Sequence, residues 1–198
     1  MVFAEKQEKI TSCASGRTMV CLNEEIVSVP MMQTDEDGDR EVNRDASDGT
    51  ATNYAYDVYW LDGAGDVLDC AKATVLKEIV EYDKSENVNN FYLNGKPQPW
   101  KSDDDSTLNK DIRMGFRQNI KDKIALGEET IDFWLGGSKI TLPCQTADML
   151  MCSLENYAYG CFNVTAAHKK AVSELTTVEE VLAYDYRVGY PTMLKMEV

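Results

Sequence analysis

The sequence predicts an α+β fold, in which a β-rich N-terminal part with hairpins precedes a compact domain of about three to four helices plus a β-hairpin. In the first half, short runs of β-branched and aromatic residues alternate with Gly, Pro, Asn and Ser turns, as strands do. In the second half, apolar residues recur at steps of three and four, as in amphipathic helices. We expect four segments: an N-terminal β segment for docking or attachment at 1–33, an acidic loop or linker at 34–53, a β-hairpin region at 54–102 and a helix-hairpin-helix domain at 103–198.

The chain is strongly acidic. Its 198 residues are enough to bury a core, and 20 Lys and Arg against 34 Asp and Glu give a formal net charge of −14. This charge repels the phosphate backbone of nucleic acids and the anionic inner face of a membrane. We therefore expect no nucleic-acid partner and no membrane insertion, whereas basic protein partners are favoured.

The N-terminal stretch has no apolar run of the length that a secretory signal requires, and no later run approaches the roughly 18 residues that span a bilayer. We expect a chain that is made and kept inside a cell. Six cysteines form no CxxC pair, and His168 is the only histidine. Because this pattern matches no zinc-site spacing, we expect reduced, mostly buried thiols, no metal site and no cofactor.

Within the N-terminal β segment, residues 10–32 are expected to form a hairpin or small meander about a Ser-Gly turn. Residues 34–53 carry seven acids and almost nothing apolar. Burial cannot offset the entropy of ordering such a segment, which indicates a loop or linker.

The acidic segment also resembles the start of a calcium-binding EF-hand loop, because Asp35, Asp37 and Asp39 alternate as the first ligands of such a loop do. The sixth position of that loop must be glycine and is Arg40, and the twelfth must be a bidentate glutamate and is Ala46. We therefore expect a solvated run of charge and no calcium site.

Two β-favouring runs flank the Gly-rich turn DGAGD in residues 54–82, which is typical of a hairpin. The second run is ambiguous, because AKATVLKEI also suits a short helix, and both alternatives stay open. Gly63 and Gly65 do not indicate a nucleotide-binding loop, since no third glycine follows and no helix begins where a phosphate would lie.

A tight hairpin is predicted at FYLNGKPQPW, residues 91–100, because Asn94-Gly95 is the strongest two-residue turn signal. Residues 101–127 then predict a helix that ends at Gly127. Its expected apolar stripe consists of Leu108, Ile112, Phe116 and Ile120. Ser106 and the adjacent acids Asp103 to Asp105 suit the start of a helix, and their adjacency is poor support for a glycosidase-like pair.

TIDFWLGGSKITLP, residues 130–143, predicts a second hairpin, with Ile131, Phe133 and Leu135 on one face and Gly136-Gly137 at the turn. An amphipathic helix follows, in which Leu150, Leu154, Tyr157 and Cys161 form the buried stripe.

A break is expected at Phe162-Asn163, after which Thr165 caps a further helix that carries His168, Val172 and Leu175 on its apolar face. Thr177 and Glu180 predict a capping box for a last helix, which Gly189 and Pro191 end before a final strand in MLKMEV.

Cys161 and His168 invite a catalytic interpretation. A Cys–His nucleophile needs an exposed sulfur with a lowered pKa, an imidazole within hydrogen-bond reach and a third group that orients it. Both residues fall on apolar helix faces instead, and no known local motif surrounds Cys161. We expect a packed thiol and a core histidine, and no catalytic, cofactor-binding or metal-binding residues.

The order of motifs in residues 79–196 resembles a domain of unknown function found in tailed-phage and prophage genes of gut bacteria. The motifs that carry the resemblance are EYD, FYLNG, a tryptophan, a helix, FWLGG, LENYAYGCFNVTAAHKKAV, TTVEEVLAYDY and GYP. Members of this family sit among tail-fibre, fibre-assembly and other virion-surface genes. The resemblance covers a little over half of the chain and implies a structural or assembly role without an activity. Members usually have an arginine in the turn after the tryptophan, which KSDDDST here lacks.

The resemblance and the composition together predict a non-enzymatic virion structural protein. We expect a small fibre or fibre-linked component on the head or tail, synthesised in the bacterial host cytoplasm. Its expected partners are other virion proteins of the capsid, tail or fibre, and copies of itself in a homo-oligomer. One alternative is a tail-fibre assembly chaperone that is absent from the mature particle. A weaker alternative is a host-surface hydrolase, which would need a pair of inward-facing acids in a deep pocket.

Overall fold

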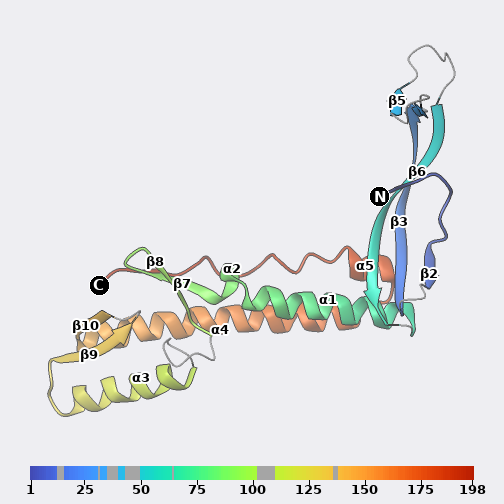
Figure 1. Cartoon of the computed structure of the whole chain (residues 1–198). Coiled ribbons are helices and arrows are strands. Elements are labelled where there is room, and N and C mark those ends of the chain that lie inside the picture. The colour runs from blue at the N-terminus through green and yellow to red at the C-terminus, as the bar shows by residue number, and fades with distance from the viewer. Residues whose placement is uncertain are drawn as a thin grey trace. The chain divides into compact units, whose positions relative to one another are not determined.

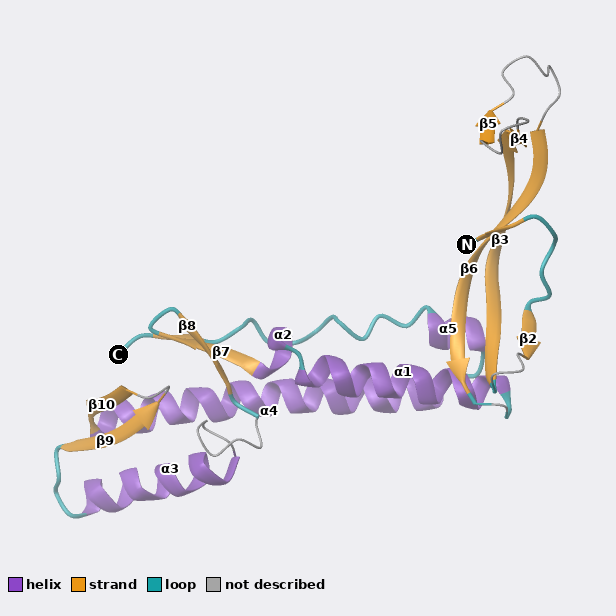
Figure 2. Cartoon of the chain, viewed as in Figure 1, coloured by secondary structure: helices purple, strands orange, loops and turns teal. Residues whose placement is uncertain are grey.

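The computed structural model describes residues 1–12, 16–30, 32–34, 40–42, 50–63, 65–101, 110–135 and 138–198. The predicted α+β class is confirmed, because strands dominate the N-terminal part and helices the remainder (Figures 1 and 2). The chain forms two compact units. The N unit comprises Met1–Thr74 with Thr176–Ala183, and the C unit comprises Val75–Leu175 with Tyr184–Val198.

An antiparallel sheet forms the N unit's framework. In spatial order its strands are β1 (Val2–Phe3), β6 (Thr50–Asp62), β3 (Arg17–Pro30) and β2 (Ile10–Ser12). The two long strands pair from Arg17 opposite Asp62 to Pro30 opposite Thr50, and a bulge interrupts the ladder just after Leu22. Two further strands, β4 (Met32–Thr34) and β5 (Arg40–Val42), pair with each other.

Alternate residues of the long strands make a small core in the N unit. Met19, Cys21 and Tyr56 are buried together on one face. Val20 and Leu61 are buried on the other face, with 0% and 1% of their surfaces exposed. The alternation follows from the period of two along a strand, which sends neighbouring side chains to opposite faces.

The hairpin predicted about the Ser-Gly turn is confirmed, since β2 and β3 pair with Ile10 opposite Val20. The loop or linker predicted for residues 34–53 is wrong where that segment is described, because residues 40–42 and 50–53 are strands. Composition did not predict these strands because backbone hydrogen bonds to neighbouring strands hold them, and such bonds do not require apolar side chains. The acids Asp35 to Asp39 lie outside the described residues.

The β-hairpin region predicted at 54–102 is wrong between its two ends, where α1 (Val67–Lys84) is an 18-residue helix. The helical alternative that the sequence left open therefore applies, and over a longer stretch. Asp66 caps the helix, since its Oδ1 accepts hydrogen bonds from the amides of Leu68 (3.0 Å) and Asp69 (3.2 Å). The strand YAYDVYWL, residues 54–61, pairs with β3, which precedes it in the sequence, and not with the segment that follows it.

The hairpin predicted at Asn94-Gly95 is confirmed in the C unit. It joins β7 (Asn90–Leu93) to β8 (Lys96–Pro99), and the φ angles of Asn94 and Gly95 are 50° and 74°. Both are positive, as a tight hairpin turn of this kind requires. The short helix α2 (Glu86–Asn89) precedes β7, and the predicted final strand is β11 (Lys195–Met196), which pairs in parallel with β7.

The helix predicted at 101–127 is described from Lys110 onward, as α3 (Lys110–Ala125). Gly127 follows it with a φ of 76°, which agrees with its predicted role at the helix end. Ile120 is fully buried and Phe116 half-buried, but Ile112 is 37% exposed. The other predicted members of this helix start, Asp103 to Asp105, Ser106 and Leu108, lie outside the described residues.

The second predicted hairpin is confirmed by β9 (Thr130–Leu135) and β10 (Ser138–Pro143), with Ile131 buried and Phe133 half-buried. Its two turn glycines lie outside the described residues. The hairpin, α3 and the sheet of β7, β8 and β11 surround one apolar core, which contains Phe91, Trp100, Ile120, Leu142, Leu154 and Met196 among others.

The break predicted at Phe162-Asn163 is wrong, because α4 (Cys144–Glu174) is one continuous helix of 31 residues. Its buried positions advance by alternating steps of three and four through the expected break, at residues 144, 147, 151, 154, 158, 161, 165, 168 and 172. Phe162 and Asn163 lie on the exposed face, where they do not interrupt this pattern. Thr165 is buried in the middle of the helix instead of capping it.

The last helix, α5 (Val178–Leu182), begins as predicted, since the Thr177 hydroxyl accepts a hydrogen bond from the Glu180 amide at 3.3 Å. It is shorter than predicted and ends at Leu182. The chain is not helical after Ala183, and the hydroxyls of Tyr184 and Tyr190 contact His168 and Thr165 of α4.

Candidate functional site

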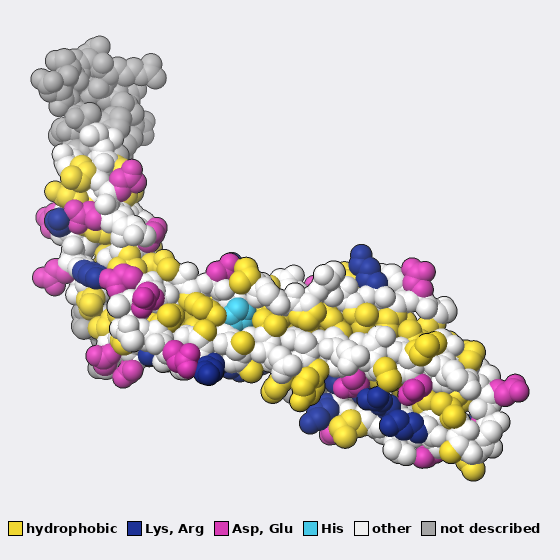
Figure 3. All heavy atoms as spheres, turned by 180° about the vertical axis from the view of Figure 1, so that it is seen from behind, with side chains coloured by type: hydrophobic (Ala, Val, Ile, Leu, Met, Phe, Trp, Pro, Cys, Tyr) yellow, Lys and Arg dark blue, Asp and Glu magenta, His cyan; other side chains and the backbone are white. Residues whose placement is uncertain are grey.

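Cys161 and His168 lie on the same face of α4 but do not form a catalytic pair. Both are buried, and seven residues of helix separate their backbones by about 10 Å along the axis. Burial raises the pKa of the Cys161 thiol, whereas a nucleophilic cysteine needs a lowered pKa. Figure 3 shows the histidine, in cyan, among hydrophobic side chains.

Both ring nitrogens of His168 are occupied within the C unit. Nδ1 lies 2.8 Å from the hydroxyl of Tyr184, and Nε2 lies 2.9 Å from the carbonyl oxygen of Val188. A carbonyl only accepts, so Nε2 carries a hydrogen, and in the neutral ring Nδ1 accepts from Tyr184. The imidazole is thereby held in one orientation by residues that follow α5, and no ring nitrogen is left for a substrate or a metal.

A buried carboxylate lies beside the same face of α4. Asp83, at the end of α1, is 6% exposed, and its Oδ1 accepts a hydrogen bond from the Thr165 hydroxyl at 2.8 Å. Its Oδ2 forms an ion pair with Lys101. The Thr165 hydroxyl also lies 3.1 Å from the Tyr190 hydroxyl, and burial raises the pKa of that tyrosine. The carboxylate is thus fully paired, as a buried charge must be.

We name this set the polar cluster: Asp83, Lys101, Thr165, His168, Tyr184 and Tyr190. Aromatic rings complete its wall, since Tyr190 lies 5.7 Å from His168 and 5.6 Å from Tyr82, measured between ring centroids. The four motifs EYD, TAAH, AYDY and GYP each contribute to it, although up to about a hundred residues separate them in sequence. Every side chain of the cluster has a partner inside the C unit, so the cluster joins chain segments together and offers no free catalytic group.

Close packing of the C-terminal segment on α4 supports this interpretation. Gly160 of α4 faces the ring of Pro191, and a Cβ built at Gly160 would lie 2.8 Å from Pro191 Cγ. Real Cβ atoms essentially never approach so closely. Glycine at this position therefore permits the segment that carries Tyr190 to lie directly against the helix.

Arg113 of α3 forms a second buried polar contact, which the sequence did not reveal. It is 4% exposed, and its Nε donates to Glu155 Oε1 at 2.7 Å. Its Nη1 donates to the carbonyl oxygen of Trp100, and its guanidinium lies 5.7 Å from the centre of the Trp100 ring. The indole nitrogen of Trp100 in turn donates to the Val88 carbonyl oxygen at 2.8 Å. An arginine therefore does contact this tryptophan, but it comes from α3 and not from the turn after Trp100.

Among the described residues, two surface depressions are lined by polar groups. One, of about 430 Å³, lies at the bulge of the N unit, where Lys6 pairs with Glu24 and Lys9 pairs with Glu179. These ion pairs lower the pKa of both carboxyls. The other, of about 640 Å³, lies beside β11 and includes Tyr92, Lys195 and Glu197 in its lining. No histidine lines either depression. Cys21 and the acids Glu24 and Glu179 line the first, and each of these acids is paired with a lysine.

No protein-family model, curated protein or solved structure matches the chain. Within the described ranges, no group of three or more His, Cys, Asp and Glu side chains is placed to hold a metal ion. Of the helices in those ranges, none is both long enough and apolar enough to cross a membrane.

Proposed function

We propose that this protein is a non-enzymatic structural component of a bacteriophage virion, a small fibre or fibre-linked protein on the head or tail. It is made in the bacterial host cytoplasm, acts as a homo-oligomer, and contacts other virion proteins. The N-terminal β segment, residues 1–33, serves as its attachment region.

The observation that carries the proposal is the convergence of the family-like motifs on the polar cluster. These motifs resemble a domain found among virion-surface genes, and in the structure they meet around Asp83, Thr165 and His168. Their most distinctive polar side chains bond to one another and hold the C unit together. Such motifs have the character of a fold signature, which suits a structural protein better than an enzyme.

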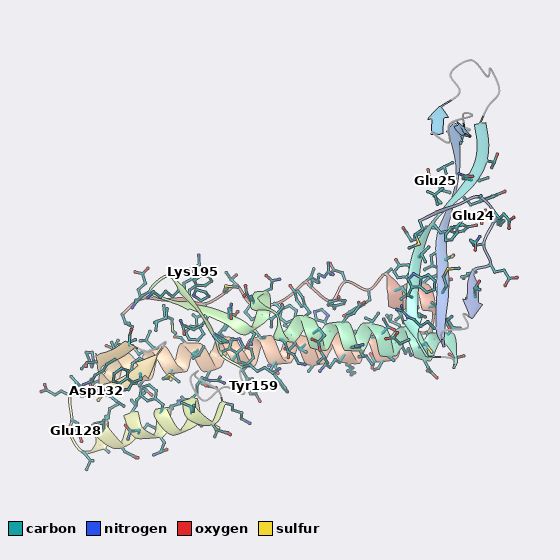
Figure 4. All side chains as sticks on the ribbon, viewed as in Figure 1. Glu24, Glu25, Glu128, Asp132, Tyr159 and Lys195 are labelled. Carbon is teal, nitrogen blue, oxygen red and sulfur yellow. The ribbon has the colours of Figure 1, made fainter. Side chains whose placement is uncertain are left out.

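The N unit supports an attachment role. β3 and β6 continue as a two-stranded ribbon beyond the β1 pairing, where residues 27–30 of β3 lie opposite residues 50–53 of β6. Ile26, which directly precedes this ribbon, is 66% exposed. Two-stranded ribbons bury little apolar surface and are marginal in water by themselves, so a partner that covers this ribbon would stabilise it. Figure 4 shows the labelled Glu24 and Glu25 beside the same stretch.

The proposal is tested in bacteria infected with a phage that encodes this protein, by measuring in which fraction of the lysate the protein is found. Lysate is separated on a density gradient, and the chain is detected in the particle and soluble fractions. We expect it to sediment with the particles and to remain there after a high-salt wash. Recovery only in the soluble fraction would contradict the proposal and favour the assembly chaperone.

A further inference from the structure

β11 is an edge strand of the C unit. It pairs with β7 on one side, and no described strand pairs with its other side. The amides of Tyr92 and Asn94 donate to the carbonyl oxygens of Leu194 (2.8 Å) and Met196 (2.9 Å). In an extended strand, the N–H and C=O of one residue point to the same edge, and successive residues alternate. The backbone groups of Lys195 and Glu197 therefore point away from β7.

The side chains beside this open edge are free to meet another chain. Lys195 and Glu197 are exposed, and neither forms an ion pair or side-chain hydrogen bond with any described residue. Glu197 directly follows β11, and the alternation of side chains along the extended chain places it on the same face as Lys195, while Met196 between them points into the core and is 9% exposed. The depression of about 640 Å³ lies at this edge, and the labelled Lys195 can be followed in Figure 4.

We propose that β11 pairs antiparallel with β11 of a second copy of this chain, about a two-fold axis at Met196. This pairing would join the two sheets of β11, β7 and β8 into one continuous sheet. The inference deepens the proposed function, on which it rests for the homo-oligomer, and it names the surface that the copies share.

Hydrogen bonding and charge favour the same register. With Met196 opposite its own copy, Lys195 lies opposite Glu197 of the second copy, and the reverse pair forms on the other side of the axis. These are the residues whose backbone groups point outward, so each pair can exchange two N–H···O bonds, as antiparallel strands require. Opposite charges at directly facing positions stabilise such a pair.

The two neighbouring symmetric registers are disfavoured. A shift in one direction places Lys195 opposite Lys195 of the second copy, and a shift in the other places Glu197 opposite Glu197, so that like charges face each other in both. A second copy therefore fits this edge in one way. A strand from an unrelated protein would have to supply the same pattern of base and acid by chance.

The contact is short, so the isolated chain is expected to self-associate only weakly. In a particle that holds several copies close together, the same pairing becomes effectively intramolecular and is much more populated. Measurements on the isolated chain consequently need high protein concentration and low salt, because salt screens exposed ion pairs.

Charge-reversal variants of the whole chain test the inference, and their self-association is measured by sedimentation velocity over a concentration series. Lys195→Glu presents two acids and Glu197→Lys presents two bases, and each is expected to weaken self-association about tenfold. The double exchange Lys195→Glu with Glu197→Lys restores the complementary pattern and is expected to recover it. An equal mixture of the two single variants is expected to form hetero-dimers, since acids then face bases.

Lys121→Glu is the matched control, because it makes the same change in net charge on an exposed position of α3. The inference is overturned if the wild-type chain stays monomeric throughout, if Lys195→Glu associates as well as Lys121→Glu, or if the double exchange fails to recover association. These outcomes are separable from the proposed function, since retention of the chain in virions is measured independently of them.

Discussion

Replacing Thr165 with valine tests whether the polar cluster stabilises the C unit. Valine keeps the shape of threonine but removes the hydroxyl that donates to Asp83 at 2.8 Å and lies 3.1 Å from the Tyr190 hydroxyl. Asp83 is 6% exposed, so water cannot replace the lost donor. A hydrogen bond to a charged group contributes about 1.5–3 kcal/mol, so we expect the free energy of unfolding to fall by about 2–3 kcal/mol.

Urea denaturation followed by circular dichroism of the helices measures this change. With an m-value of about 2 kcal/mol/M, the midpoint is expected to fall by about 1 M. Thr141→Val is the matched control, because the Thr141 hydroxyl also donates to a carboxylate, Asp132, at 2.6 Å, but on an exposed hairpin. We expect that control to change stability by no more than about 0.5 kcal/mol. An equal effect of the two substitutions would refute the stabilising role given to the polar cluster.

Two further predictions concern α4. Gly160→Ala places a methyl group against Pro191 and is expected to destabilise the C unit. Gly115→Ala, in open space on α3, is expected to stabilise it by about 0.5–1 kcal/mol. Thermal unfolding compares the two variants, and stabilisation by both would contradict the close approach of Pro191 to Gly160. Burial raises the pKa of Tyr157, whose hydroxyl donates to the Asn90 carbonyl oxygen at 3.0 Å. Because the unfolded chain loses this proton near pH 10 and the folded chain retains it, stability is fully present below about pH 10 and is lost as pH rises further. Urea midpoints measured on either side of pH 10 should fall less steeply for Tyr157→Phe than for the wild type, and identical slopes would refute the assignment.

The elements that the sequence predicted correctly are those with strong local signals. Asn94-Gly95 requires positive φ angles that few other residue pairs accept, and TIDFWLGGSKITLP combines strand alternation with a glycine turn. Thr177 likewise marks a helix start by a side chain that bonds to its own neighbourhood. These features depend on residues a few positions apart, so one sequence is enough to find them.

The errors arose where a local signal was weak and a longer pattern decided the structure. AKATVLKEI, residues 71–79, is too short to distinguish strand from helix by itself. Its buried Ala71, Val75 and Ile79 recur at steps of four, and the same spacing continues to buried Asp83 beyond the segment. Phe162 and Asn163 suggested a break because their own helix propensity is modest. The buried spacing on either side of them continues without a change of phase, and packing of that face outweighs the propensity of two exposed residues.

The polar cluster could be predicted only in part. The spacing placed Cys161 and His168 on a buried face, which the structure confirms. It did not connect His168 with Tyr184, or Thr165 with Asp83, because those contacts join segments that are distant in the chain. A buried threonine and histidine within an apolar stripe were the available signal, since buried polar groups need partners and therefore imply that other polar residues lie nearby.

The central claim, that this protein is a structural component of a virion, is tested most directly by counting its copies in purified phage particles. Quantitative mass spectrometry gives the ratio of this chain to the major capsid protein in the same particles. We predict a fixed ratio that corresponds to a symmetric number of copies per particle and does not change between preparations. A trace amount that varies between preparations, alongside abundant chain in the infected-cell lysate, would contradict the claim.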